Sequence, residues 1–539
     1  METTLERGAG LVLPIYSLPS RWGCGTLGRE ARDFIDFLKE SGQAYWQVLP
    51  VCPTSMGDSP YAGLSAFAGN PYFIDLETLC EEGLLEEWEC QQRDWGGHPA
   101  YVDYGKMYKN RYPLLRLAYS RSHHQDTPEF QEFCRDNQAW LDDYALFMAV
   151  KNHFSGACWI NWDRDIRLHE EAACRRYREM LAEEIGFWTF LQFKFYQQWE
   201  AVRAYANEQG ILIIGDMPIY AALDSVDVWA DYTQFQLDEE HVPESVAGVP
   251  PDAFSDEGQL WGNPLYDWEK MEEDDFSWWR RRMEISARLY DVIRIDHFIG
   301  IVRYFAIPNG AVNGKVGVFH KGPGKKFLEA MQEAAGQAKI IAEDLGVITD
   351  EVRKLKNDAG IPGMKVLEFG FDSGSDNDYL PHNHEFNSVV YAGTHDNETL
   401  AGYLQGISGW TKKHLMDYCA IRDEEEYKAC AQDRVIRLVY SSICSAAMLQ
   451  VQDVLGLGNE ARTNTPATAG NNWKWRLMPD QLQYEHCKYL KDLAWLYRRL
   501  PEKKEEKAAE EKDAENINAE NINAENIEAA GINTAGIEA

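Results

Sequence analysis

The sequence predicts an α/β fold: a (β/α)8 barrel (TIM barrel) with large insertions between strands that form subdomains around the active-site mouth. Eight short apolar runs recur along the chain, as buried parallel strands do. Helix-like stretches lie before several of them, as at 31–40, 199–207 and 325–335, and this alternation predicts a parallel sheet. Acids also follow three of the runs. The eight runs are 11–14, 46–50, 211–216, 292–295, 339–342, 364–367, 389–395 and 447–451.

The spacing of these runs is uneven, which predicts insertions at about 51–205, 217–290 and 398–442. Insertions at the mouth of a barrel usually build the walls of the substrate site. We therefore expect residues 1–500 to form one catalytic barrel. Residues 501–539 are expected to form a separate tail.

The tail begins with the mixed-charge run 502–513, and the repeat Ala-Glu-Asn-Ile-Asn follows at 514 and 519. Its isoleucines recur every five residues, and five helical steps turn by about 140° beyond a full circle, so no apolar stripe forms. The tail also contains no aromatic residue. It is expected to be disordered or transiently helical.

Composition excludes several classes of partner. The net charge of −34 disfavours nucleic acid and anionic membrane surfaces, so a neutral substrate fits better. The 11 cysteines include no Cys-x-x-Cys pair and are expected to be reduced thiols. The first residues lack the pattern of a secretory signal, which predicts a cytoplasmic location.

Three acids follow apolar runs: Asp296, Glu343 and Asp396. In a parallel barrel the side chains at the carboxyl ends of the strands converge on one mouth. A nucleophilic carboxylate, a second carboxyl group as proton donor and contacts to sugar hydroxyls are the requirements of glycosyl transfer. The three acids therefore predict that chemistry.

Each of the first two acids has an alternative interpretation. Arg294 points the same way as Asp296 along the strand and would keep it an anion, as a nucleophile requires, although a purely structural salt bridge fits the same pattern. Apolar neighbours would raise the pKa of Glu343 and keep a proton available. Alternatively, Glu343 caps the next helix, a role that Asp344 could also take.

The run Thr394-His395-Asp396-Asn397 offers several groups that could hydrogen-bond to sugar hydroxyls. Metal binding is the rival interpretation, because His297 and His395 also lie near strand ends and His382 and His384 lie nearby. However, the first strands carry no His-x-His, and the sequence contains no His-Glu-x-x-His. The absence of both metal-binding motifs argues against this interpretation.

Aromatic residues flank polar ones in the predicted insertions, at Asp58-Ser59-Pro60-Tyr61, at Val102-Asp103-Tyr104 and at Gln259-Leu260-Trp261-Gly262-Asn263. Flat rings stack on the apolar faces of pyranose units, and the polar neighbours would bond the rim hydroxyls. Packing in the core is the alternative for each ring.

Nine short motifs cover strand ends and the loops after them. They are Tyr45–Pro50, Gly57–Tyr61, Ser65–Pro71, Gly215–Tyr220, Gly248–Asp252, Trp261–Tyr266, Arg294–His297, Ala342–Gly346 and Gly393–Asn397. Through these motifs the chain resembles, from about Gly8 to Leu500, the 4-α-glucanotransferases of glycoside hydrolase family 77, also called amylomaltases or disproportionating enzymes.

The resemblance implies Asp296 as nucleophile, Glu343 as acid/base and Asp396 as transition-state stabiliser, with Arg294 supporting the nucleophile. It implies maltooligosaccharides, glucose and soluble α-glucans as partners, and no metal or organic cofactor. The further residues implied to bind substrate are Asp216, His297 and His395 at the cleavage point, Tyr61 and Tyr104 in a second, remote groove, and Trp261 on a loop over the cleft; Asp58, Ser59 and Asn263 are their polar neighbours.

The departures from the family pattern are small. Cys24, Thr26 and Ala62 replace the usual Ile, Asp and Gln, and the repeat tail is foreign to the family. They leave the chemistry intact. Two rival functions are an α-glucan hydrolase, in which water takes the acceptor's place, and a non-catalytic glucan-binding protein, which the presence of all three acids disfavours.

Overall fold

The computed structural model describes the chain outside its ends and three short gaps: residues 5–55, 57–251, 256–468 and 470–501. Two compact units make up the chain, one of residues 1–499 and one of residues 500–539. The predicted tail lies outside the described residues except for Pro501. Among the described residues, no helix combines the length and apolarity that crossing a membrane requires.

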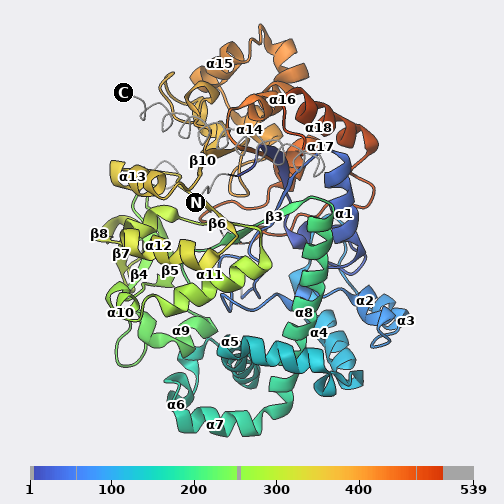
Figure 1. Cartoon of the computed structure of the whole chain (residues 1–539), viewed down its shortest axis with the longest axis vertical. Helices are drawn as coiled ribbons and strands as arrows, with labels where there is room; N and C mark the ends of the chain where they lie inside the picture. The colour runs from blue at the N-terminus through green and yellow to red at the C-terminus, as the bar shows by residue number, and fades with distance from the viewer. Residues whose placement is uncertain (1–4, 56, 252–255, 469, 502–539) are drawn as a thin grey trace, which may run out of the picture. The chain divides into compact units, whose positions relative to one another are not determined.

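Eight parallel strands form the barrel (Figure 1). Each of them overlaps one of the eight predicted runs. They are joined in the order β10-β11-β12-β1-β2-β3-β6-β9. The ends of this order meet, because the Ala342 N–H donates to Pro362 O over 2.9 Å. The strands are β1 (Gly8–Val12), β2 (Tyr45–Gln47), β3 (Leu212–Met217), β6 (Val292–Ile295), β9 (Lys339–Ala342), β10 (Gly363–Val366), β11 (Ser388–Tyr391) and β12 (Ala446–Gln450).

One apolar cluster with members on all eight strands includes Tyr45, Ile214, Ile341 and Met448, all 2% exposed or less. Because alternate residues of a strand face opposite sides, this buried set orients every strand.

The predicted helical stretches are confirmed as α1, part of α8, and α12. In α1 the buried residues Ala31, Phe34, Ile35 and Leu38 recur at helical spacing and give one apolar face. The connection between β10 and β11 differs from this pattern of strand and helix. Its residues 367–387 form only two short 3-10 turns, because this segment is rich in Gly, Asp and Asn. The helices outside the three predicted insertions are α1 (Arg29–Glu40), α12 (Gly324–Ala335), α13 (Asp350–Asp358), α17 (Val451–Leu455) and α18 (Tyr484–Leu496).

Helices dominate the connections that contain the predicted insertions. The two longest, α5 and α8, pack along each other. These helices are α2 (Leu76–Glu81), α3 (Glu87–Gln91), α4 (Tyr104–Arg121), α5 (Pro128–His153), α6 (Arg164–Arg167), α7 (Glu171–Met180), α8 (Ala182–Glu208), α9 (Val226–Ala230), α10 (Trp268–Glu273), α11 (Ser277–Leu289), α14 (Leu400–Gly406), α15 (Gly409–Tyr418) and α16 (Glu424–Ser441).

A second, antiparallel sheet was not predicted. It has the order β5-β4-β7-β8 and draws two strands from each of two connections: β4 (Ser245–Val249) and β5 (Gln259–Pro264) precede β6, whereas β7 (Arg303–Pro308) and β8 (Val318–Lys321) follow it. The segment between β6 and β9 therefore also adds structure beyond a barrel helix.

Arg499 ties the end of the first unit to the barrel. Its buried guanidinium donates to Gly8 O at the start of β1, to Ser445 O just before β12, and to Tyr440 O. No carboxylate pairs with it among the described residues. Its role is structural, because it holds three chain segments together through backbone carbonyls.

Candidate active site

Asp296 and Glu343 stand side by side at the same edge of the barrel. In the parallel pairing of β6 with β9, Ile295 lies opposite Ala342, and the two acids are the next residues of their strands. Their backbones continue the ladder, since Asp296 N–H donates to Met217 O and Glu343 N–H donates to Ile295 O, both over 3.0 Å. Neighbouring strands lie about 4.8 Å apart, so this register holds the two carboxyl groups close together.

Arg294 links two carboxylates. It pairs with Asp216 in the register of β3 and β6, and its Nη1 donates to both oxygens of Asp216, at 2.7 and 2.8 Å, and to Asp296 Oδ1 at 3.0 Å. Although burial disfavours the cation, these two carboxylates raise the pKa of Arg294 well above its usual value. The expected Arg294–Asp296 contact is therefore present, but Arg294 is shared with Asp216.

Glu343 accepts two backbone hydrogen bonds, from His297 N at 2.7 Å and from Leu345 N at 2.9 Å. Burial raises the pKa of this carboxyl to about 8, against the effect of Arg294. Glu343 is therefore a protonated acid at neutral pH, as the sequence predicted from its apolar neighbours.

The alternative role of a helix cap is wrong for both candidate residues. Thr349 caps α13, since its side chain accepts from Val352 N. Asp344 instead pairs with Lys356 Nζ at 2.7 Å and accepts from Met364 N at 2.7 Å.

His297 has a left-handed backbone with φ of 50°, which is uncommon for a residue with a side chain. This conformation directs its N–H to Glu343 and its ring to Trp261, whose ring centroid lies 5.0 Å away edge to face. Burial lowers the pKa of His297, so the ring is neutral at pH 7. Strain of this kind is typical of functional sites.

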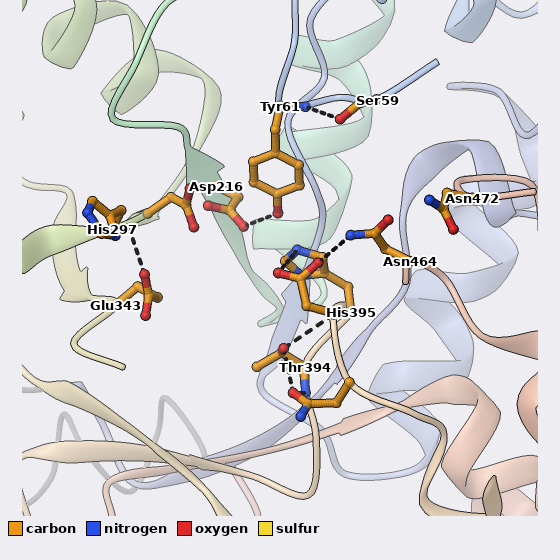
Figure 2. A network of polar contacts seen from close by, with 12 residues as sticks. Ser59, Tyr61, Asp216, His297, Glu343, Thr394, His395, Asn464 and Asn472 are labelled. Carbon is orange, nitrogen blue, oxygen red and sulfur yellow. Dashed lines mark hydrogen bonds and ion pairs between the residues drawn. The ribbon is translucent and has the colours of Figure 1, made fainter. Parts of the chain in front are cut away.

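Asp396 lies on the loop after β11 with its side chain 46% exposed. His395 Nε2 is 3.4 Å from its Oδ2, and Asn464 Nδ2 donates to its Oδ1 over 2.6 Å (Figure 2). Although the partial burial of Asp396 opposes ionisation, His395 and Asn464 hold its pKa below its usual value, so it is an anion. Arg462 also donates to Asp396 O at 2.7 Å.

The sequence reasoning missed Asn464 and Arg462. Neither follows a strand run, and they reach the site from the loop after α17. The alternating pattern of a strand provides no signal for such a loop. The backbone of this loop is also fixed beside Asp396, because Asn464 N–H donates to His395 O at 3.1 Å.

Tyr61 lies in the central cluster, and its expected place in a remote groove is wrong. Its hydroxyl donates to Asp216 Oδ2 over 2.8 Å, and its ring stacks on His395 at 5.1 Å between centroids (Figure 2). Ser59 supports it, because its Oγ accepts from Tyr61 N at 3.3 Å. The loop from β2 folds back over the barrel mouth, which the local pattern could not predict.

Tyr104 does line a second groove, of about 1050 Å³, together with Asp58. The Tyr104 hydroxyl donates to Trp473 O over 2.6 Å, which orients its ring. Further aromatic and charged side chains line the same groove, among them Tyr101, Glu460, Lys474 and Trp475.

Trp261 and Asn263 lie on β5 of the antiparallel sheet. Trp261 is 38% exposed, so part of its ring faces solvent. The side chain of Asn263 donates to Ala221 O over 2.9 Å and holds β5 against the loop after β3.

Within the described residues, no group of three or more His, Cys, Asp or Glu could hold a metal ion.

Residues 13–482 match the profile of the family described as 4-alpha-glucanotransferase. The chain belongs to this family. A 4-alpha-glucanotransferase of Thermus thermophilus is 46% identical over 507 residues, covering 92% of this chain and all of that one. A second, from Clostridium butyricum, is 43% identical over 487 residues, covering 90% and 99% of the two chains.

A solved structure shows the same fold. The amylomaltase from Streptococcus agalactiae in complex with acarbose matches with a TM-score of 0.88 at 38% identity, covering 92% of this chain and 100% of that one. The predicted (β/α)8 barrel of a 4-alpha-glucanotransferase is therefore confirmed.

Replacing Glu343 by Gln is expected to stabilise the fold at neutral pH. A pKa raised to about 8 means that the folded state retains a proton that the unfolded chain releases above its ordinary value of 4.5. Wild-type stability therefore falls as pH rises between these values, by about 1.4 kcal/mol per pH unit at most. Melting curves should show a Tm gain of several degrees for Glu343→Gln at pH 8 and none at pH 4. An equal gain at both pH values would contradict a raised pKa.

Proposed function

We propose that the chain is a retaining 4-α-glucanotransferase that moves α-1,4-linked glucan segments from a donor maltooligosaccharide to the 4-hydroxyl of an acceptor glucan or glucose. The observation that supports this proposal is the register of β6 and β9, in which Asp296 and Glu343 are the residues that follow the paired Ile295 and Ala342. Retaining enzymes require two carboxyl groups about 5 Å apart, whereas inverting ones leave room for a water between them.

In the first step Asp296 attacks the anomeric carbon while Glu343 protonates the departing glycosidic oxygen. The glucan segment is then bound covalently to Asp296, and the shortened donor leaves with the proton. Arg294 supports this assignment because its positive charge lies against Asp296 and stabilises that carboxylate as an anion, while it also pairs with Asp216. The protonated state of Glu343 at neutral pH is the state that a general acid needs.

In the second step the ionised Glu343 takes the proton of the acceptor's 4-hydroxyl, and that oxygen displaces Asp296 from the anomeric carbon. The two inversions retain the α configuration. Asp396, held as an anion beside His395, is suited to stabilise the positive charge that develops on the sugar. Asp216, His297, His395 and Tyr61 surround the same position and are proposed to hold the sugar at the cleavage point.

We also propose that the groove lined by Asp58 and Tyr104 holds a second part of a long glucan. Its volume of about 1050 Å³ and its aromatic lining suit several pyranose units. Ser59, Trp261 and Asn263 are proposed to support the walls of the site. We also propose that residues 1–500 form the catalytic part and that the tail is appended to it. The proposed location is the cytoplasm, which the free state of all 11 cysteines supports.

Pure maltotriose tests the function. Transfer produces glucose together with longer glucans, whereas hydrolysis produces only smaller sugars, and a binding protein leaves the trisaccharide unchanged. Water at about 55 M competes with millimolar acceptor, so transfer needs an acceptor advantage of about 10⁴ to 10⁵, or roughly 6 kcal/mol. A restricted mouth that orients the acceptor can supply this advantage.

Trp261→Ala is expected to lower transfer more than hydrolysis, because Trp261 packs over His297 at the mouth. The measurement is the number of new reducing ends per cleavage event. Trp495→Ala is the matched control, since Trp495 is 71% exposed on α18. If reducing ends per cleavage do not rise in Trp261→Ala relative to this control, Trp261 does not govern acceptor choice.

A further inference from the structure

Glu368 is a buried acid outside the proposed catalytic set. It lies just after β10, and its side chain packs against the start of the loop that carries Asp396. A Cβ added to Gly393 would lie 2.8 Å from Glu368 Oε1, so this carboxyl lies close against the backbone at Gly393. The backbone is also fixed, because Glu368 N–H donates to Ala392 O over 3.1 Å and Tyr403 Oη donates to Glu368 O over 3.0 Å.

A chain of hydrogen bonds connects this carboxyl to Asp396. The Asn397 side chain bonds to Glu368. Asn397 Oδ1 accepts from both N and Oγ1 of Thr394, at 2.9 and 2.8 Å, so the Asn397 amide nitrogen is the group left to face Glu368. Thr394 Oγ1 in turn accepts from Asp396 N at 3.3 Å. The Asn397 amide is therefore held between Thr394 and Glu368.

The surroundings of Glu368 favour its neutral form. The charged groups that face it are Asp453 on α17, Glu398 before α14, and Arg462 from the loop after α17. Two of the three are acids, and Arg462 is already bonded to Asp396 O and Asn464 O. Burial among these groups raises the pKa of Glu368 well above its usual value. Among the described residues its Oε1 has no hydrogen-bond partner.

We propose that Glu368 is a positioning residue for Asp396: its side chain accepts from the Asn397 amide, and the 394–397 turn so fixed presents Asp396 to the substrate. The inference rests on the proposed role of Asp396. Because Glu368 acts only through this turn, it affects how well Asp396 stabilises the transition state rather than how well substrate binds.

The test compares Glu368→Leu with Glu368→Gln. Leucine removes the acceptor for the Asn397 amide, whereas glutamine keeps a neutral acceptor of the same shape. We expect Glu368→Leu to lower kcat at least about 30-fold with KM within about threefold, and Glu368→Gln to retain at least about a third of kcat. Arg499→Met is the control for lost stability, because it weakens the fold at the opposite end of the strands and should keep kcat at temperatures below its Tm.

A double variant separates positioning from general damage. In an Asp396→Asn background, Glu368→Leu should cost less than about threefold in turnover of an α-maltotriosyl fluoride donor, since there is no carboxylate left to position. The inference is overturned if Glu368→Leu keeps normal kcat, if Glu368→Gln falls as far as Glu368→Leu, or if the two losses multiply. Normal turnover by Asp396→Asn alone would instead overturn the proposed role of Asp396.

Discussion

Asp296→Asn and Glu343→Gln are each expected to lower turnover of maltotriose by at least about a thousandfold while the protein stays folded, because binding alone cannot replace the covalent and proton-transfer steps. Asp296 has no substitute at the end of β6, since Asp216 is held by both Arg294 and Tyr61. Glu343 is the buried acid next to it. Transfer is measured from the appearance of glucose and longer glucans, and folding from Tm.

A fluoride donor separates the two roles. Fluoride leaves without protonation, so Glu343→Gln should still form the covalent intermediate from α-maltotriosyl fluoride and accumulate it, because the base of the second step is missing. Asp296→Asn should form none. Intact-protein mass measurement detects the added trisaccharide. A glycosylated Asp296→Asn variant, or ordinary maltotriose turnover by either variant, would refute the assignment.

Arg294→Met is expected to abolish most activity and also to destabilise the fold. Its guanidinium is 4% exposed and compensates Asp216, whose side chain is fully buried. Removing one partner of a buried ion pair costs about 3–5 kcal/mol, because the other charge is left without compensation. The loss of the contact to Asp296 should lower turnover at least about 100-fold as well. Tm and initial transfer rates measure the two effects.

Two further variants distinguish stability from catalysis. Asp216→Asn added to Arg294→Met removes the uncompensated charge and should recover part of the Tm but not the activity. Lys194→Met removes a cation that is 9% exposed and paired with Glu82 in the helical insertion, and it should lower Tm with little change in transfer. If the double variant regains activity together with Tm, Arg294 has no direct role beside Asp296.

The barrel and its three acids could be predicted from the chain alone, because both depend on local patterns. A buried strand needs a short apolar run, and the eight runs overlap β1, β2, β3, β6, β9, β10, β11 and β12, with ends that differ by a few residues. The residue that follows such a run must lie at the carboxyl edge of the sheet, so Asp296 and Glu343 were placed without knowledge of any contact.

The remainder of the site depends on contacts between distant parts of the chain. Tyr61 reaches Asp216 across 155 residues and Asn464 reaches Asp396 across 68, through loops that have no periodic pattern. The partner of Arg294 follows from the register of β3 with β6, which only barrel closure sets. The sequence by itself therefore determined the eight strands and the acids that follow them, since the strands have a local apolar pattern and the acids stand next to it. Only the tertiary structure decided which residues orient those acids, because that depends on how loops without periodicity pack at the mouth.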